Sequence, residues 1–196
     1  MEKKEINGQG GVIKKITQNE IFSYLSGKNF KDENFPVASV LIKKNVREII
    51  RVFYSFARTS DDIADSDNLT SLKKLKILKF FDKSLSNSKK SNIDFLDKII
   101  NLYKKFPESK CYSRDLLKAF ILDTTTKRYK NWADLVSYCR YSANPVGRFF
   151  IYLTYENNNH SFENEKKIFK SSDNLCTALQ IINHVQDCKD DYLKHN

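Results

Sequence analysis

The sequence predicts an all-α protein built as one domain. Only five glycines and three prolines interrupt the 196 residues, and apolar residues recur at helical spacing over long stretches. No stretch alternates strictly between apolar and polar residues, as a half-buried β-strand would. A chain of this length can bury a single hydrophobic core. We therefore expect one helical domain over residues 1–196.

The first two expected helices span residues 44–65 and 71–84. The first follows the break at Pro36 and is apolar nearly all round, which predicts that it is buried. Its apolar residues include Phe53, Phe56, Ala57, Ile63 and Ala64. The second is amphipathic, because three leucines and Phe80 alternate with a cluster of lysines at helical spacing.

The remaining expected helices span residues 92–105, 114–129, 132–155 and 163–193. Pro107 separates the first two of these, and the polar stretch 156–161 separates the last two. Pro145 and Gly147 fall inside the expected helix 132–155. The proline predicts a kink there, and the glycine permits close approach, so that an open backbone carbonyl could face the pocket.

Two aspartate pairs are the most informative feature of the chain. Asp61 and Asp65 lie four residues apart in one expected helix, and Asp187 and Asp191 do so in another. Residues at this spacing lie one above the other on a helix face, so each pair presents two carboxylates in one direction. A single such pair in a lysine-rich chain is most simply explained as part of a solvated helix surface. Two facing pairs could hold Mg²⁺, which commonly bridges to substrate phosphates, so the pattern predicts a diphosphate substrate bound through this metal.

Each pair continues a stripe of polar residues along its helix. The first stripe comprises Tyr54, Arg58, Asp61 and Asp65, and the second comprises Cys176, Gln180, Asn183, Asp187 and Asp191. The second stripe lies on a helix that is otherwise apolar. Polar side chains on a buried helix are costly unless they find partners, so the two stripes predict a wet or metal-filled cavity.

Several segments resemble the squalene/phytoene synthase family. Residues 53–65 (FYSFARTSDDIAD) and 179–191 (LQIINHVQDCKDD) are similar to its two aspartate-rich motifs. Residues 138–148 (YCRYSANPVGR) resemble the hydroxysqualene synthase branch in particular. Segments 33–39, 126–129, 132–135 and 176–180 agree with this branch, as does Gln186. The resemblance runs from about Glu33 to Asp191, and so many separate matches make coincidence an unlikely explanation.

The resemblance implies a fold and a set of site residues. The fold is an isoprenoid synthase-type helical bundle around a central cavity. By resemblance, Asp61, Asp65, Asp187 and Asp191 bind Mg²⁺, and Asp61 and Asp187 are catalytic together with Tyr138, which lies near the reacting carbons. Substrate-binding positions implied in the same way are Asn34, Tyr54, Arg58, Gln180 and Asn183.

The reaction implied by the resemblance begins with ionisation of presqualene diphosphate. Rearrangement of the cyclopropane and capture by water then give hydroxysqualene, without a redox cofactor. Magnesium would turn the diphosphate into a good leaving group, and dry aromatic walls would stabilise the carbocation. The aromatic residues nearest the motifs are Phe35, Phe53, Tyr54, Tyr138, Tyr141, Phe149 and Phe150.

Two alternatives stay open at this point. A condensing squalene or phytoene synthase would join two prenyl diphosphates such as farnesyl diphosphate, but segment 138–148 argues against it. A non-catalytic relative or assembly factor belongs to another class, and such relatives tend to lose the aspartates. All four pair aspartates are present here, which favours an enzyme.

Charge and terminal sequences bear on partners and location. The net charge is +10, but the lysines are scattered and no recognition motif appears, so we expect no nucleic acid partner. The basic amphipathic helix 71–84 leaves a peripheral membrane contact open. No apolar run is long enough to span a membrane, and residues 1–5 lack the apolar core of a signal peptide. We expect a cytoplasmic protein, with any membrane contact at the inner face, that works with other enzymes of squalene synthesis.

The end of the chain departs from the family pattern. Members continue well beyond the second motif, whereas this sequence stops at Asn196. The expectation is a C-terminally truncated domain that lacks its last helices, with activity contingent on the missing part. Apolar residues of the helix 163–193, among them Leu175, Leu179, Ile182 and Val185, would then be left uncovered.

Overall fold

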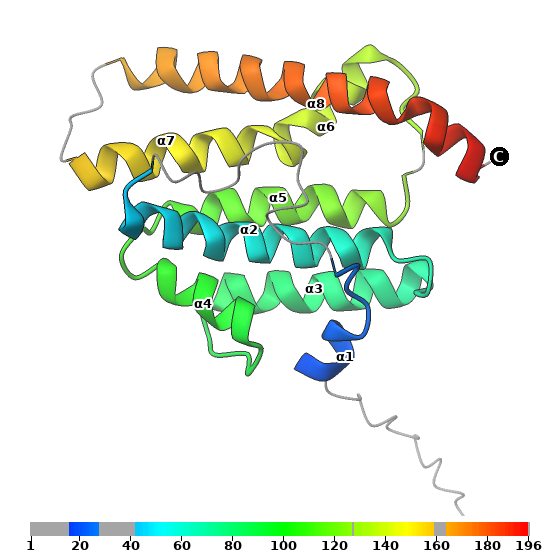
Figure 1. Cartoon of the computed structure of the whole chain (residues 1–196), viewed down its shortest axis with the longest axis horizontal. Coiled ribbons are helices and arrows are strands. Elements are labelled where there is room, and N and C mark those ends of the chain that lie inside the picture. Colours follow the sequence, from blue (N-terminus) through cyan, green and yellow to red (C-terminus); the bar gives the residue numbers. More distant parts are fainter. Residues whose placement is uncertain (1–15, 28–41, 127, 159–163, 196) are drawn as a thin grey trace, which may run out of the picture.

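A computed structural model describes residues 16–27, 42–126, 128–158 and 164–195. Within these ranges the regular structure is helical, with no β-strand, which confirms the all-α prediction (Figure 1). In chain order the helices are α1 (Gln18–Phe22), α2 (Lys44–Asp65), α3 (Ser71–Asn87), α4 (Asp94–Leu102), α5 (Ser109–Asp123), α6 (Trp132–Ser142), α7 (Asn144–Asn158) and α8 (Glu165–His195).

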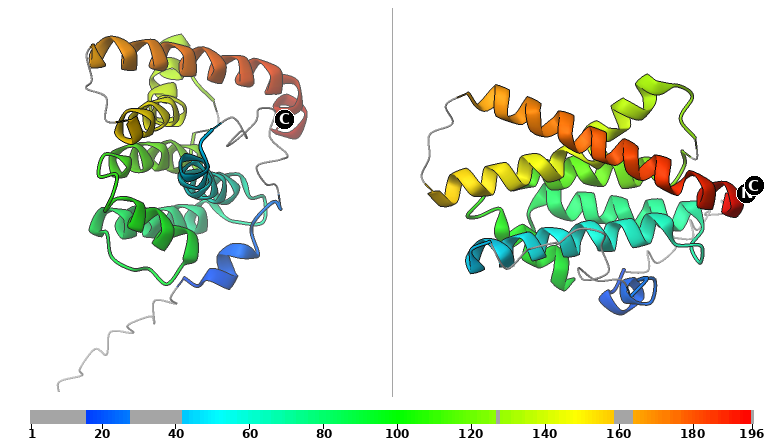
Figure 2. Two further views of the ribbon diagram at one scale, coloured as in Figure 1. Left: turned by 60° about the vertical axis from the view of Figure 1, so that its left-hand side comes forward. Right: turned by 45° about the horizontal axis from the view of Figure 1, so that its top comes forward.

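The helices are stacked in layers around α2 and α5. Helices α3 and α4 pack on one side of this pair, and α7 packs on the other. Helix α8 lies outside α6 and α7, away from α3 and α4, as both views of Figure 2 show. The core between α2, α3 and α5 contains the fully buried side chains of Phe56, Phe81 and Leu117. Phe53 of α2 stacks on Phe149 of α7 with 3.9 Å between ring centroids, which joins α7 to the core.

Helix α2 has the predicted bounds but not the predicted burial on all sides. Phe53, Phe56 and Ile63 are buried, whereas Ser55 and Asp65 are exposed. The helix therefore buries one broad face against α3, α4 and α5. The face that carries the polar stripe is partly open, which places its charged groups at the edge of the core.

Several helix boundaries differ from the sequence prediction. Helix α5 ends at Asp123 instead of continuing to residue 129, because the Thr124 hydroxyl donates a hydrogen bond to the carbonyl of Ile121 (2.7 Å) and the chain turns. The short helix α1 was not predicted. It begins at the Thr17 cap, whose hydroxyl accepts a hydrogen bond from the amide of Glu20 (3.3 Å), and it buries Ile21 in the core.

The expected helix 132–155 is two helices. Helix α6 ends at Ser142, and α7 begins at Asn144 after a single non-helical residue. Pro145 therefore lies in the first turn of α7, where its missing amide hydrogen leaves no helical bond unmade, and it does not kink a continuous helix. The close approach expected at Gly147 is present, since a Cβ atom at this position would overlap Ser172 Oγ and Cys176 Sγ of α8. The open carbonyl facing the pocket stays a prediction.

The outer helix α8 exposes several apolar side chains. Leu175, Leu179, Ile182 and Val185 have 61%, 52%, 51% and 67% of their surface exposed. More than half of each of these side chains is therefore left uncovered by the described residues. Among the described residues, none of the helices is both long and apolar enough to cross a membrane.

The close contact at Gly147 gives a stability prediction. Gly147→Val should lower the free energy of unfolding by about 1–3 kcal/mol, because the branched side chain overpacks the α7–α8 interface. Gly147→Ala is the matched control. Its methyl group meets only the ends of two short side chains that can rotate, and the helix propensity gained, about 1 kcal/mol, offsets the strain. Urea unfolding of both variants checks this, and equal stabilities would contradict it.

Candidate active site

The first aspartate motif surrounds Arg58 on α2. The guanidinium of Arg58 contacts Asp62 Oδ1 through Nη2 (2.6 Å) and Nε (3.0 Å), and its Nη1 lies 3.1 Å from Asp61 Oδ2. Asp62 is buried, and its second oxygen accepts a hydrogen bond from the amide of Ser26 (3.1 Å). Arg58 is thus held in place by carboxylates of its own motif. Asp62, which sequence reasoning gave no role, is its buried partner.

Asp61 and Asp65 are the other two carboxylates of this motif. Asp61 is half-buried and Asp65 is exposed. Burial and the neighbouring Asp65 carboxylate raise the pKa of Asp61 to about 7, although the Arg58 guanidinium acts in the opposite direction. The effects of burial and of the neighbouring carboxylates on Asp61 therefore exceed the effect of Arg58.

Asp123, the last residue of α5, adds a further carboxylate to this group. Burial raises its pKa to about 6, and the Asp65 carboxylate adds to the increase. Its Oδ2 accepts a hydrogen bond from the hydroxyl of Tyr138 on α6 (2.8 Å). Burial and the Asp123 charge in turn raise the pKa of Tyr138, so this phenol stays protonated at neutral pH. Asp123 therefore connects the first aspartate motif to Tyr138.

Sequence reasoning missed Asp123 because it has no carboxylate partner at helical spacing. A signal was available, since the residue lies three positions before the segment 126–129 that carries part of the family resemblance. Only the packing of α5 between α2 and α6 shows that it lies beside both Asp65 and Tyr138.

The second aspartate motif lies on α8, next to α6. Asp187 and Asn183 are exposed, and Gln180 is half-buried. His184 lies between Asn183 and Asp187 in the sequence. Its ring is 5.8 Å from the Tyr138 ring and 5.9 Å from the Tyr129 ring, measured between centroids. The second stripe therefore runs beside Tyr138. The side chain of Asp191 and the whole of Asn34 lie outside the described part of the chain.

The two motifs do not form a closed metal cage in the described residues. No group of three or more His, Cys, Asp or Glu side chains there is arranged to hold a metal ion. The charged groups that shift the pKa of Asp61 come from α2 and α5, and the described carboxylate of α8, Asp187, is not among them. The predicted meeting of Asp61 and Asp65 with Asp187 and Asp191 across one cavity stays a prediction.

The chemistry of the carboxylates on α2 nevertheless fits Mg²⁺. Asp61 and Asp65 supply hard oxygen donors four residues apart on one face of α2, as this ion prefers. Burial and repulsion from Asp65 raise the pKa of Asp61, and a bound cation would relieve that repulsion.

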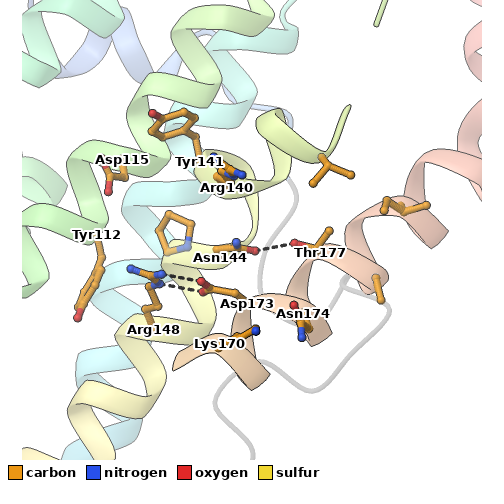
Figure 3. A pocket seen from close by; sticks show the side chains of 14 residues that line it. Tyr112, Asp115, Arg140, Tyr141, Asn144, Arg148, Lys170, Asp173, Asn174 and Thr177 are labelled. Carbon is orange, nitrogen blue, oxygen red and sulfur yellow. Dashed lines mark hydrogen bonds and ion pairs between the residues drawn. The ribbon is translucent and has the colours of Figure 1, made fainter. Parts of the chain in front are cut away.

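A groove of about 680 Å³ lies elsewhere, between α5, α6, α7 and α8 (Figure 3). Arg148 of α7 forms a two-pronged ion pair with Asp173 of α8 (2.8 and 2.5 Å), and Thr177 donates to Asn144 Oδ1 (3.0 Å). The groove contains none of the aspartates of the two motifs, so it is not the predicted cavity. A smaller pocket of about 300 Å³ is bordered by Tyr129 and Tyr138.

Comparison with known proteins gives the class of the protein. Residues 29–196 match the squalene/phytoene synthase family model, and the chain belongs to this family of enzymes. No solved structure matches it.

Within the family, the chain is similar to hydroxysqualene synthases, as predicted. It is 42% identical to that of Zymomonas mobilis over 174 residues, which cover 88% of this chain and 56% of the relative. It is 40% identical to that of Rhodopseudomonas palustris over 170 residues, covering 85% and 54%. The enzyme of Sinorhizobium fredii is 37% identical over 166 residues, covering 85% and 54%. The chain thus spans about half the length of the relatives it matches.

The raised pKa of Asp123 predicts how stability depends on pH. In the unfolded chain an aspartate titrates near pH 4, so the folded protein binds the Asp123 proton more tightly. The stability contributed by that proton is present below about pH 4 and is lost as the pH rises through about 6. Asp123→Asn, which is always neutral and still accepts from Tyr138, should therefore stabilise the protein at pH 8 by about 1–2 kcal/mol, with the shift discounted for partial exposure.

Urea unfolding at pH 4.5 and pH 8 measures this difference. The stabilisation should be small at the lower pH, and Asp67→Asn, in the exposed turn after α2, should show little change at either. An Asp123→Asn variant less stable than the wild type at pH 8 would contradict the electrostatic picture.

Proposed function

We propose that this protein converts presqualene diphosphate to hydroxysqualene with the help of Mg²⁺. The observation that carries the proposal is the carboxylate group around Asp61, Asp65 and Asp123, which borders Tyr138 through a direct hydrogen bond. The similarity to hydroxysqualene synthases of three bacteria supports the same reaction. A group of neighbouring carboxylates suits a metal and a diphosphate better than it suits an uncharged ligand.

Residues of this chain have separate roles in the proposed reaction. Asp61, Asp65, Asp187 and Asp191 would hold Mg²⁺, which when bound neutralises the charge that develops on the departing diphosphate. Arg58, fixed by Asp61 and Asp62, would orient the diphosphate together with Tyr54. Gln180, Asn183 and Asn34 would complete the polar surface.

Tyr138 would face the reacting carbons. Its hydroxyl is bound to Asp123, so the phenol is oriented and kept protonated. A neutral aromatic ring stabilises a nearby carbocation through its face without forming a bond to it. Phe53 and Phe149, stacked between α2 and α7, belong to the core and keep α7 in place.

The location and partners follow from the substrate. We propose that the protein works in the cytoplasm, where it receives its lipid substrate from a condensing enzyme of the same synthesis. The basic helix α3, on which Leu72 is 81% exposed, offers a surface for peripheral contact with an anionic membrane.

The first functional prediction concerns the metal. In the complete gene product, turnover of presqualene diphosphate should stop in excess chelator and return with Mg²⁺. Asp61→Ala and Asp187→Ala should each lower kcat/KM at least about 100-fold, because each removes part of the charge that stabilises the leaving group. Asp67→Ala, an exposed aspartate outside the motifs, is the control. Undiminished turnover in chelator would exclude the metal-dependent reaction.

The second functional prediction separates hydrolytic from condensing chemistry. Supplied with farnesyl diphosphate alone, the protein should release little diphosphate and form little squalene, whereas presqualene diphosphate should yield hydroxysqualene. Product analysis by gas chromatography and mass spectrometry distinguishes the two. Efficient conversion of farnesyl diphosphate would establish the condensing alternative, and binding without conversion of either substrate would favour a non-catalytic relative.

A further inference from the structure

The groove between α5, α6, α7 and α8 has no role in the proposed function (Figure 3). Its volume of about 680 Å³ falls within the range of small-molecule sites in proteins, about 300–1,000 Å³. Segment 138–148, which the sequence singles out, contributes to its lining the side chains of Arg140, Tyr141, Asn144, Pro145 and Arg148. Of this segment, the proposed function uses only Tyr138. The other polar side chains of the segment therefore border a cavity apart from the aspartate motifs.

The charges around the groove are not balanced. Its two carboxylates, Asp115 and Asp173, each form an ion pair with a cation (2.7 Å, and 2.8 and 2.5 Å). Arg140 and Lys170 also line the groove, and within the described part of the chain neither of them pairs with a carboxylate. Both side chains are exposed to solvent. Their positive charges are therefore left for an anion to neutralise.

Asn144 supplies a buried polar group beside these cations. Only 7% of its surface is exposed, and its Oδ1 accepts a hydrogen bond from the Thr177 hydroxyl (3.0 Å). This contact orients the amide, so the two hydrogens on its nitrogen are the part that remains to donate. An oriented amide donor next to unpaired cations suits the recognition of anionic oxygens.

Arg148 adds a guanidinium whose position is fixed. Its Nε and Nη2 donate to the two oxygens of Asp173, and its central carbon lies 5.6 Å from the centre of the Phe169 ring. Held between a carboxylate and an aromatic ring, this guanidinium keeps Nη1 outside the ion pair. That nitrogen can donate to a ligand in the groove without breaking the contact to Asp173.

We propose that the groove is a binding site for a phosphate or diphosphate group. Arg140 of α6 and Lys170 of α8 supply the charge, and Asn144 with Arg148 of α7 supplies the oriented donors. A phosphate group suits this set because it presents several anionic oxygens to donors that come from three helices. The volume of the groove leaves room for bridging waters. The inference is independent of the proposed function, since no aspartate of the two motifs lines the groove.

The first test measures the binding of inorganic diphosphate to the complete gene product by isothermal titration calorimetry. Excess chelator is present, so that binding through a metal at Asp61 and Asp65 does not contribute. The double variant Arg140→Gln with Lys170→Gln should bind at least about 10-fold more weakly, because two charge-assisted contacts are lost. Lys167→Gln, which changes an exposed lysine of α8 outside the groove, is the matched control and should bind as the wild type does.

A second variant probes the sign of the charge at the buried position. Asn144→Asp keeps an oxygen that accepts from the Thr177 hydroxyl, but it replaces the amide donor by a carboxylate that repels an anion. It should also bind diphosphate at least about 10-fold more weakly. Circular dichroism checks that each variant is folded. Raising the salt concentration should weaken binding to the wild type, because the cations are exposed.

Free ions and the headgroups of anionic lipids both carry a phosphate group. A parallel measurement therefore follows cosedimentation with vesicles of phosphatidylcholine and phosphatidylglycerol. Diphosphate binding that the double variant loses would assign the site to a free ion, and vesicle binding lost in the same variant would assign it to a lipid headgroup. Folded variants that bind both probes as the wild type does would overturn the proposal, as would a wild-type protein that binds neither. Turnover of presqualene diphosphate, measured separately, bears only on the proposed function.

Discussion

The carboxylates gathered at one end of α2 and α5 are the constraint on which the site depends. Arg58 contacts Asp61 and Asp62, and the charges of Asp65 and Asp123 contribute to the raised pKa of Asp61. The buried Asp62 takes most of the arginine contacts, so Asp61 is left with a raised pKa beside Asp65. Burial and the charge of Asp123 raise the pKa of Tyr138, so that phenol stays protonated. Without a cation the arrangement costs free energy, which is expected of a binding site and not of a structural ion pair.

Much of this arrangement could be predicted from the sequence, because it is local. The bounds of α2 and the single face shared by Tyr54, Arg58, Asp61 and Asp65 follow from helical spacing alone. Tyr138 was identified through its family motif. The glycine at 147 was expected to allow close approach, and its contact with α8 has a direct structural basis.

The parts that could not be predicted depend on contacts between distant segments. Asp62 has the same charge as its neighbours, and only its burial against Ser26 distinguishes it. Asp123 and His184 are single residues far apart in sequence, and each contacts Tyr138. The break between α6 and α7 was misjudged because a proline in the first turn of a new helix and a proline that kinks a continuous one look alike in sequence.

Helix α8 brings the second motif next to Tyr138 through His184. Further contacts position this helix, since Ser172 and Cys176 lie close to Gly147 and Asp173 pairs with Arg148. At 100° per residue, Asp187 points roughly 60° away from the direction of His184, and Gln180 roughly 40° away. The polar stripe therefore faces the space beside α6, on the flank where Asp187 is exposed.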